Sequence, residues 1–225
     1  MTNGSSARRD DNGGSFEVFV EGWLVRQEHY LDELHSALQH CHESSDDDLK
    51  ELISRVLAHY QQYYEEKSKI TQRNAFLVFS PTWFTTLERA LLWIAGFKPG
   101  LVFRVVRDSV DDLSDEQNQR MTSLMNKTKA QERALNDEQA KIQESVAAPQ
   151  LVNVARRRGG AVQDQETAVE SLRSALETVV TEADSLRMTT ALKMMDILRP
   201  VQNVKFLAAA AQLHLKLRGY GLGRS

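Results

Sequence analysis

The helical spacing of apolar residues constrains this chain more than any other feature of its 225-residue sequence. Along most of the chain, apolar side chains recur at positions i, i+3, i+4 and i+7, which places them on one face of an α-helix. Proline, which interrupts helices, occurs only four times. The sequence contains no pair of alternating apolar segments joined by a hairpin turn and no repeat of fixed period. It therefore predicts an all-α protein.

Two helices are predicted in the first third of the chain. The first follows Ser15, a suitable N-cap, and runs to about Leu38. The polar segment 42–48 interrupts the apolar pattern and supplies a cap for a second helix, whose apolar face starts at Leu49. Residues 1–14 are too polar to offset the entropy of ordering, so we expect a disordered tail there.

A third helix is predicted to begin at Ser80-Pro81, with serine as N-cap and proline at the first helical position. Gly96 would end this helix, because glycine followed shortly by proline, here Pro99, is a common stop pattern. The apolar segment 101–106 is rich in valine, which a strand would accommodate. No partner strand is near, and we interpret this segment as helical or irregular.

Two long helices are predicted in the second half. One begins at a capping box in 114–117 and runs to about residue 146, and the other spans about 163–198. At about 1.5 Å per residue each would be near 50 Å long. The flexible, basic segment 156–160 joins them as an antiparallel hairpin. Pro200 opens a last helix.

The expected architecture is thus an elongated bundle of about six or seven helices that includes two long antiparallel ones. The apolar fraction of 41% is sufficient for a core. One domain would cover residues 15–218. A flexible C-terminus, 219–225, follows it and contains three glycines.

Composition and charge exclude several classes of protein. The net charge of −3 gives no overall attraction to nucleic acid, and Asp108, Asp111 and Asp112 stand where a basic region would precede a zipper. Direct DNA binding is therefore not expected. No apolar run is long enough for a membrane span or resembles a secretory signal. The single cysteine, Cys41, cannot form an intramolecular disulfide, so we expect a soluble protein of the nucleus, the cytoplasm or both.

The sequence also lacks the short motifs that carry catalysis. It contains no Gly-x-Ser-x-Gly, no phosphate-binding glycine loop, no His-Glu-x-x-His and no Cys-x-x-Cys. Its carboxylates fall mainly at solvent-facing positions with lysine or arginine nearby. We predict that the protein is not an enzyme.

Histidines are the main candidates for ligand binding. His40, Cys41 and His42 lie together near the end of the first helix, but no zinc-site spacing relates them, and we interpret them as an exposed polar helix end rather than a ligand site. His59 is expected to be a surface or half-buried residue. His214 lies among apolar residues and is expected to be buried and hydrogen-bonded to a neighbour.

Three tryptophans, Trp23, Trp83 and Trp93, fall on apolar stripes and are expected in the core. A cleft between them would suit an apolar ligand. The weak apolar face of the helix over 114–146 suits either homodimer packing or a solvated hairpin.

A basic loop offers a candidate contact surface. Arg156, Arg157 and Arg158 would suit a phosphate group or nuclear import, and a solvated connection is the alternative.

Three segments resemble the plant Delay of Germination (DOG) domain. They are Phe16-Glu-Val-Phe-Val-Glu-Gly-Trp23-Leu24, the segment from Ser80-Pro81-Thr-Trp83 through Leu87-Glu88-Arg89 to Trp93-Ile94-Ala-Gly96-Phe97-Lys98-Pro99, and Asp112-Leu113-Ser114-Asp-Glu-Gln117 with Leu186-Arg187. The resemblance spans about residues 15–218. It implies a mainly structural role for the motif residues Trp23, Pro81, Trp83, Glu88, Trp93, Gly96 and Pro99.

The family includes regulators of seed dormancy and maturation and the C-terminal part of TGA-type basic-zipper transcription factors. Without a zipper, this chain resembles the stand-alone DOG-like proteins, the fourth type in particular. The resemblance implies a non-enzymatic role in abscisic acid signalling through binding to type 2C protein phosphatases. An alternative that it also implies is a transcriptional cofactor that binds basic-zipper factors.

The resemblance further implies a sensor of haem or another apolar ligand. A C-terminal histidine pair would be expected for haem, whereas His214 stands alone, with arginine at 218 and alanine at 210. The residues available to such a sensor would be His214, His40 and His42. No other metal site is expected.

Overall fold

The computed structural model of the chain describes residues 7–40, 45–147 and 162–223. Within these residues it contains eight helices and no strand, which confirms the all-α prediction. The count exceeds the six or seven expected because Asn74 ends one helix and caps a further short one. The helices are α1 (Ala7–Gln39), α2 (Asp46–Arg73), α3 (Ala75–Phe79), α4 (Thr86–Ala90), α5 (Leu101–Ser109), α6 (Asp115–Ala147), α8 (Val162–Met195) and α9 (Pro200–Gly221).

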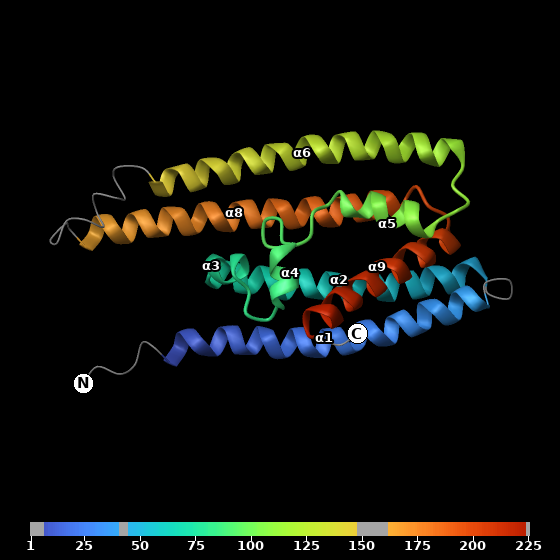
Figure 1. Cartoon of the computed structure of the whole chain (residues 1–225), viewed down its shortest axis with the longest axis horizontal. Coiled ribbons are helices and arrows are strands. Elements are labelled where there is room, and N and C mark those ends of the chain that lie inside the picture. The colour runs from blue at the N-terminus through green and yellow to red at the C-terminus, as the bar shows by residue number, and fades with distance from the viewer. Residues whose placement is uncertain (1–6, 41–44, 148–161, 224–225) are drawn as a thin grey trace.

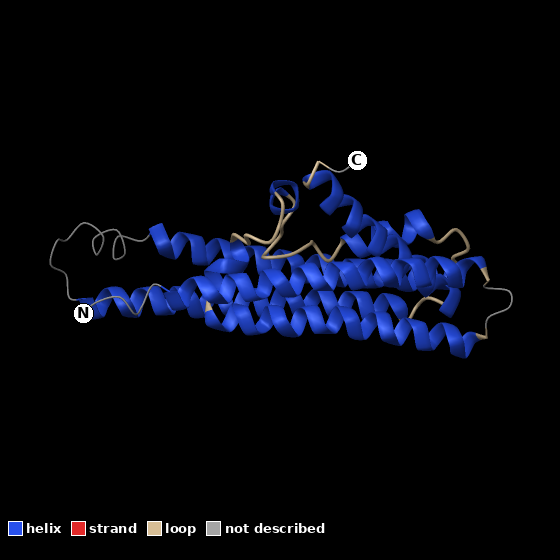
Figure 2. Cartoon of the chain, turned by 90° about the horizontal axis from the view of Figure 1, so that it is seen from below, coloured by secondary structure: helices blue, strands red, loops and turns tan. Residues whose placement is uncertain are grey.

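The long helices run along one axis and make the molecule elongated, as predicted (Figure 1). α6 and α8 lie side by side as the expected antiparallel hairpin, and α1 and α2 form a second antiparallel pair. α9 crosses obliquely over α1 and α2, and the short α4 and α5 pack against it. Figure 2 shows from below that the C-terminal end lies on one side of the bundle.

The buried apolar residues form two clusters along the long axis. The first cluster joins the second half of α1 and the first half of α2 to α5, α9 and the adjoining ends of α6 and α8; Leu34, Val56 and Met194 belong to it. The second cluster joins the other halves of α1 and α2 to α3 and the middle of the hairpin; Val20 and Ile70 belong to it.

Local capping produces most of the helix starts that the sequence predicts. Ser45 begins α2 with a capping box, in which Asp48 N–H donates to Ser45 Oγ (3.2 Å) and Ser45 N–H donates to the Asp48 carboxylate (3.1 Å). The box at Ser114 and Gln117 forms before α6 in the same way, with bonds of 3.0 and 3.1 Å. Pro200 is the first residue of α9, as expected.

Two predicted chain ends differ in the structure. α1 begins at Ala7, inside the 1–14 segment expected to be a disordered tail, because a formed helix extends at one hydrogen bond per added residue. Residues 1–6 lie outside the described residues. α9 continues to Gly221, inside the 219–225 segment expected to be flexible. A Cβ at Gly221 would lie 2.1 Å from Thr85 Oγ1, so this glycine allows the end of α9 to pack closely on the start of α4.

The prediction of one helix over 80–96 is wrong. Ser80 and Pro81 precede an irregular segment, and α4 starts only at Thr86, because the capping box of Thr85 and Glu88 satisfies the backbone donors there. The helix ends at Ala90, and a tight turn follows it. The segment over 101–106, interpreted as helical or irregular, lies in helix α5.

Candidate ligand-binding cavity

An apolar cavity of about 360 Å³ lies between α2, α5, α8 and α9. This volume is at the lower end of the range for pockets that hold small molecules. Each helix contributes aliphatic side chains to the wall, among them Leu57 of α2, Val102 and Val105 of α5, Met188 and Leu192 of α8, and Leu207 and Ala210 of α9. The polar side chains in the wall are Tyr60, Gln61, Tyr64, Lys98, Arg187 and His214.

Residues 97–99 form part of the cavity wall, and the tight turn before them sets their position. Trp93 N–H donates to the Gly96 carbonyl (2.6 Å), and Gly96 N–H donates to the Trp93 carbonyl (3.1 Å). Between them, Ile94 and Ala95 have φ angles of 42° and 58°. This left-handed conformation costs residues with a Cβ about 1–2 kcal/mol each. Contacts from elsewhere in the fold must therefore hold the turn.

Arg187 of α8 supplies these contacts. Its guanidinium donates to the carbonyls of Trp93, Ile94 (2.8 Å) and Phe97 (2.7 Å). The side chain is 7% exposed, so these charge-assisted bonds form away from water. A Cβ at position 96 would lie 2.7 Å from the guanidinium carbon, which explains why glycine stands there.

A single carboxylate, that of Asp184, serves two buried cations. Arg187 Nη1 donates to Asp184 Oδ1 (2.5 Å), and so does Lys67 Nζ of α2 (2.8 Å). Lys67 is 2% exposed, and burial lowers its pKa to about 8 although Asp184 acts in the opposite direction. The network ties α2 to α8 beside the cavity.

Two polar groups in the cavity wall make no hydrogen bond to any residue that the structure describes, namely the Tyr64 hydroxyl and the His214 ring. The His214 ring packs against Trp23 and Phe97, with ring centres 5.4 and 6.0 Å apart. The prediction that His214 is buried and bonded to a neighbour is wrong on both points: the residue is half-buried, and its ring packs on aromatic rings that offer it no hydrogen bond.

Both of these groups are uncharged at neutral pH. Burial lowers the pKa of His214 to about 4, with Glu88 acting against this shift and Arg218 adding to it. Burial also raises the pKa of Tyr64 well above its usual value near 10. The cavity thus offers a phenol and a neutral imidazole to a ligand.

A buried chain of polar side chains lies behind the cavity wall. Gln27 Nε2 donates to the Tyr60 hydroxyl (2.6 Å), and His59 Nε2–H donates to Gln27 Oε1 (2.9 Å). The Trp23 indole stacks on His59, with ring centres 4.4 Å apart, and donates to its carbonyl (2.9 Å). The prediction that His59 is a surface or half-buried residue is wrong: it is 4% exposed, because Gln27 and Trp23 of α1 supply its contacts.

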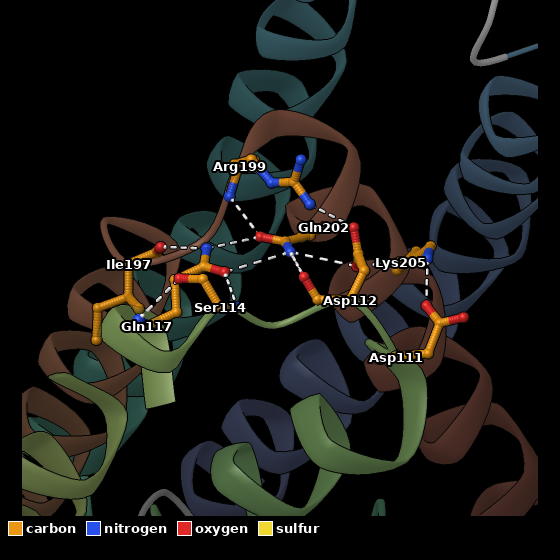
Figure 3. Close-up of polar contacts among 8 residues, drawn as sticks. All are labelled: Asp111, Asp112, Ser114, Gln117, Ile197, Arg199, Gln202 and Lys205. Atoms are coloured by element: carbon orange, nitrogen blue, oxygen red, sulfur yellow. Dashed lines mark hydrogen bonds and ion pairs between the residues drawn. The ribbon is translucent and has the colours of Figure 1, made fainter. Parts of the chain in front are cut away.

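Beyond the first core cluster, a polar junction joins the start of α6 to the start of α9 (Figure 3). Gln117 Nε2 donates to the Ile197 carbonyl and to Gln202 Oε1, both at 2.8 Å. Gln202 Nε2 donates to the Asp112 carbonyl (3.0 Å), and Arg199 N–H donates to Gln202 Oε1 (2.9 Å). These bonds fix α5 and α9, which both contribute to the cavity wall.

The residues of the family-like motif fall into two groups. Gly96 and Trp93 form the turn held by Arg187, and Pro99 lines the cavity. The others lie in the adjoining core. Glu88 is 1% exposed, accepts from Thr85 N–H and pairs with Arg218 of α9 at 3.1 Å. Trp23, Pro81 and Trp83 are buried there as well.

The histidines expected for haem are not brought together. His40 lies exposed at the end of α1, where its Nδ1 contacts the Ser36 carbonyl at 2.9 Å. Trp23, which packs on His214, precedes His40 by 17 residues on the same helix, or about 25 Å. His40 and His214 therefore cannot bind one iron from its two faces. His42, Arg156, Arg157 and Arg158 lie outside the described residues.

Sequence reasoning missed Arg187, Lys67 and Tyr64 as members of a site. A usable signal existed, since Arg187 and Lys67 are charged residues on otherwise apolar helix faces. The cavity itself had no local signal, because four helices far apart in the sequence form it.

In the ranges that the structure describes, no three histidine, cysteine, aspartate or glutamate side chains lie close enough to hold a metal ion. None of the described helices has both the length and the apolar character needed to cross a membrane.

Comparisons with a family model and with individual proteins both find similarity to proteins of the DOG type. Residues 30–108 match the DOG1 family, described as seed dormancy control. The chain is 37% identical over 215 residues to Protein RESPONSE TO ABA AND SALT 1 of Arabidopsis thaliana, covering 91% of this chain and 94% of that protein. It is 35% identical to Protein DOG1-like 4 of the same plant, covering 92% and 91%. It is also 32% identical to Transcription factor TGA7 over 91% of this chain but 55% of that protein.

Proposed function

This chain belongs to the DOG1-like family of plant regulatory proteins, and from that premise we propose that it is a non-enzymatic regulator of seed dormancy or maturation in abscisic acid signalling. The observation that carries the proposal is the 37% identity, along almost the whole chain, with a protein named for a response to ABA and salt. The cavity supports a binding role, since its polar side chains are two phenols, one amide, one imidazole and two paired cations, and none of its lining residues is a serine, threonine or cysteine that the imidazole could activate.

The partners that we propose are type 2C protein phosphatases, which the protein would bind and restrain. The test is a phosphatase assay on a phosphopeptide substrate with the purified full-length chain at micromolar concentration, together with a direct binding measurement. We expect a complex and reduced phosphatase activity. Unchanged activity and no detectable complex would exclude this partner class.

A transcriptional cofactor is the alternative, and the similarity to Transcription factor TGA7 and Transcription factor TGA3 favours it. In this case the protein would act in the nucleus, where it would be recruited by a basic-zipper factor. Chromatin immunoprecipitation should then give a signal that disappears when the zipper factor is removed. A signal that persists without that factor would count against recruitment.

For either partner, the cavity suggests that a small apolar molecule regulates the protein. A ligand in the cavity would contact four helices at once and would stabilise their arrangement by its binding free energy. We therefore propose the cavity as a regulatory site. The test compares the partners captured by the native protein with those captured by Ala210→Trp, a variant whose cavity is filled. A regulatory cavity predicts that the two sets of captured partners differ.

A further inference from the structure

Exposed cations gather on the outer side of α5 and α6, where these two helices lie near each other (Figure 1). They are Arg104 and Arg107 of α5 and Lys129 and Arg133 of α6, and we call these four residues the basic strip. The chain as a whole carries a net charge of −3, so its overall composition does not account for a local excess of positive charge.

Two contacts between α5 and α6 show how the helices are placed. The Arg107 guanidinium lies 3.7 Å from the sulfur of Met125, near the end of α5. Just before the start of α5, Gly100 N–H donates to the Glu132 carboxylate (2.7 Å). Residue numbers rise along α5 as they fall along α6, so the two helices are antiparallel here.

Helix spacing then brings the four cations together. Arg104 lies three residues before Arg107, and Arg133 lies four residues after Lys129, so each pair shares one face of its helix. Lys129 in turn lies one turn after Met125, the residue that Arg107 contacts. The strip therefore combines two cations from each helix.

The cations of the basic strip are poorly neutralised by the rest of the protein. Lys129 and Arg133 make no hydrogen bond or ion pair with any residue that the structure describes. Within the same residues, Arg107 donates only to a methionine sulfur, which is a weak acceptor. Arg104 lies 3.8 Å from Asp108, but both side chains are exposed and water screens the pair. An incoming anion could therefore pair with all four cations without breaking a strong contact.

Carboxylates at both ends limit the length of an anion that fits the basic strip. Asp137 lies one turn beyond Arg133 on α6, and Asp108 follows Arg107 on α5. From residue 125 to residue 133 the strip is about 12 Å long. About four residues of an extended chain cover this distance. Nucleic acid, with one charge at about every 1.7 Å of the duplex, would run past the strip and meet these carboxylates.

The basic strip also lacks the apolar side chains that insert into a membrane. None of the large apolar residues exposed on the described surface belongs to α5 or α6. Helices that bind at a lipid surface combine cations with such residues. The strip therefore suits a short acidic segment better than a lipid surface.

We propose that the basic strip is a docking surface for a partner protein and binds an extended, acidic segment of that partner. In an extended chain, alternate side chains lie on one side and recur at about 6–7 Å, close to the spacing of cations one helical turn apart. Arginine guanidinium groups pair with carboxylates through two parallel hydrogen bonds, and lysine adds a point charge. Such a surface could serve either partner class proposed above.

The first experiment measures binding of a rhodamine-labelled peptide to the full-length protein by fluorescence anisotropy. The peptide alternates glutamate and serine over about eight residues, enough to span the strip. A control peptide has glutamine in place of glutamate. We expect only the acidic peptide to bind, at about 50 mM salt, and to be released at about 500 mM, because salt screens exposed charges. No binding of the acidic peptide, or equal binding of both peptides, would overturn the proposal.

The second experiment locates the binding on the basic strip. Lys129→Gln with Arg133→Gln removes the two cations of α6, and the fold should be kept because both side chains are exposed and glutamine favours helices. We expect this double variant to bind the acidic peptide about three- to tenfold more weakly, the effect of losing two exposed ion pairs.

The matched control removes the same charge elsewhere. Lys127 points to another side of α6, about 200° around the helix from Lys129, and Lys216 lies near the end of α9, which crosses over α1 (Figure 1). Lys127→Gln with Lys216→Gln should change the affinity less than about twofold. If both double variants weaken binding equally, the peptide responds to overall charge and the basic strip is not its site.

Two other occupants of the strip would give different results. Duplex DNA that displaces the acidic peptide at a lower concentration of negative charge would make the strip a nucleic-acid contact. Self-association in sedimentation velocity that Lys129→Gln with Arg133→Gln abolishes would make a second copy of the chain the occupant. Either result would overturn the proposal of an acidic partner segment and leave the regulatory function open. Conversely, failure of the phosphatase assay would leave peptide binding to the strip unaffected.

Discussion

At the scale of the residue, Arg187 shows how a distant side chain stabilises a strained turn. Its removal leaves the carbonyls of Trp93, Ile94 and Phe97 without their donor. We predict that Arg187→Met lowers the free energy of unfolding by about 3–5 kcal/mol, the usual cost of breaking a buried pair. Urea denaturation followed by circular dichroism measures this loss.

The control for this substitution lies on the same helix. Arg173 pairs with Glu170 and donates to the Gln72 carbonyl at the surface (2.9 Å). Arg173→Met should cost no more than about 1 kcal/mol, because solvent screens an exposed pair. Equal losses for the two arginine variants would show that the turn does not depend on Arg187.

His59 makes stability depend on pH. Burial, together with the charges of Arg26 and His214, lowers the pKa of His59 to about 4, whereas an unfolded chain has a histidine pKa near 6.5. The unfolded state therefore binds more protons between these values, so stability is full above pH 6.5 and falls as the pH drops toward 4. We predict a loss of about 2 kcal/mol from His59 by pH 5, measured by urea denaturation at several pH values.

Replacing His59 with glutamine separates the effect of His59 protonation on stability from the effects of other titrating groups. His59→Gln keeps a donor for Gln27 but cannot gain a proton in this range. The variant should be less stable than the native protein at neutral pH and should lose less stability between pH 6.5 and 5. Parallel pH profiles for the two proteins would assign the dependence to other groups, such as His214, whose pKa burial also lowers to about 4.

At the scale of the element, sequence predicted those helices whose ends are determined locally. The capping boxes before α2 and α6 and the proline that opens α9 need only neighbouring residues, and each formed as expected. The prediction of one helix over 80–96 was wrong because the geometry of this region depends on contacts with residues about 90 to 130 positions away. Arg187 donates hydrogen bonds to the turn after α4, and Arg218 pairs with Glu88, a buried residue of α4.

The junction between α6 and α9 is a further element held by distant contacts. Gln202 is fully buried there and bonds to Gln117, to Arg199 N–H and to the Asp112 carbonyl. We predict that Gln202→Leu, which roughly keeps the volume, costs about 2–4 kcal/mol, because several buried polar groups lose their partner. Chemical denaturation gives the cost, and faster amide hydrogen exchange over 110–117 would localise it.

Lys205 at the edge of the same junction provides the control. It pairs with Asp111, whose side chain is exposed (Figure 3). Lys205→Met should cost no more than about 1 kcal/mol and should leave exchange over 110–117 unchanged. If the Gln202 and Lys205 variants lose the same stability, the buried amide network does not hold the junction.

At the scale of the whole molecule, the sequence predicted shape but not the cavity. Helix lengths and the hairpin follow from apolar spacing, so the elongated bundle was predictable. The cavity arises where α2, α5, α8 and α9 meet, and no local pattern specifies how closely four helices approach. Its most informative residues, Tyr64 and His214, are 150 positions apart in the sequence.

The two core clusters raise the question of whether the molecule unfolds in one step. α1, α2, α6 and α8 each contribute to both clusters, and the buried polar groups Gln27, His59 and Lys67 lie on these helices. A helix cannot lose one half of its packing without weakening the other half, since helix formation is cooperative. We therefore expect one cooperative unit rather than two.

Substitutions in one cluster, followed with a probe in the other, test this expectation. Met194 is fully buried in the first cluster, and Trp83 and Trp93 lie in or against the second. We predict that Met194→Ala costs about 2–5 kcal/mol and shifts the tryptophan fluorescence transition as far as the circular dichroism transition. Ile70→Ala in the second cluster is the matched variant and should also move both signals together. A fluorescence transition that stays in place in Met194→Ala while circular dichroism shifts would show that the two halves unfold separately, because the tryptophans report mainly on the cluster that was not changed.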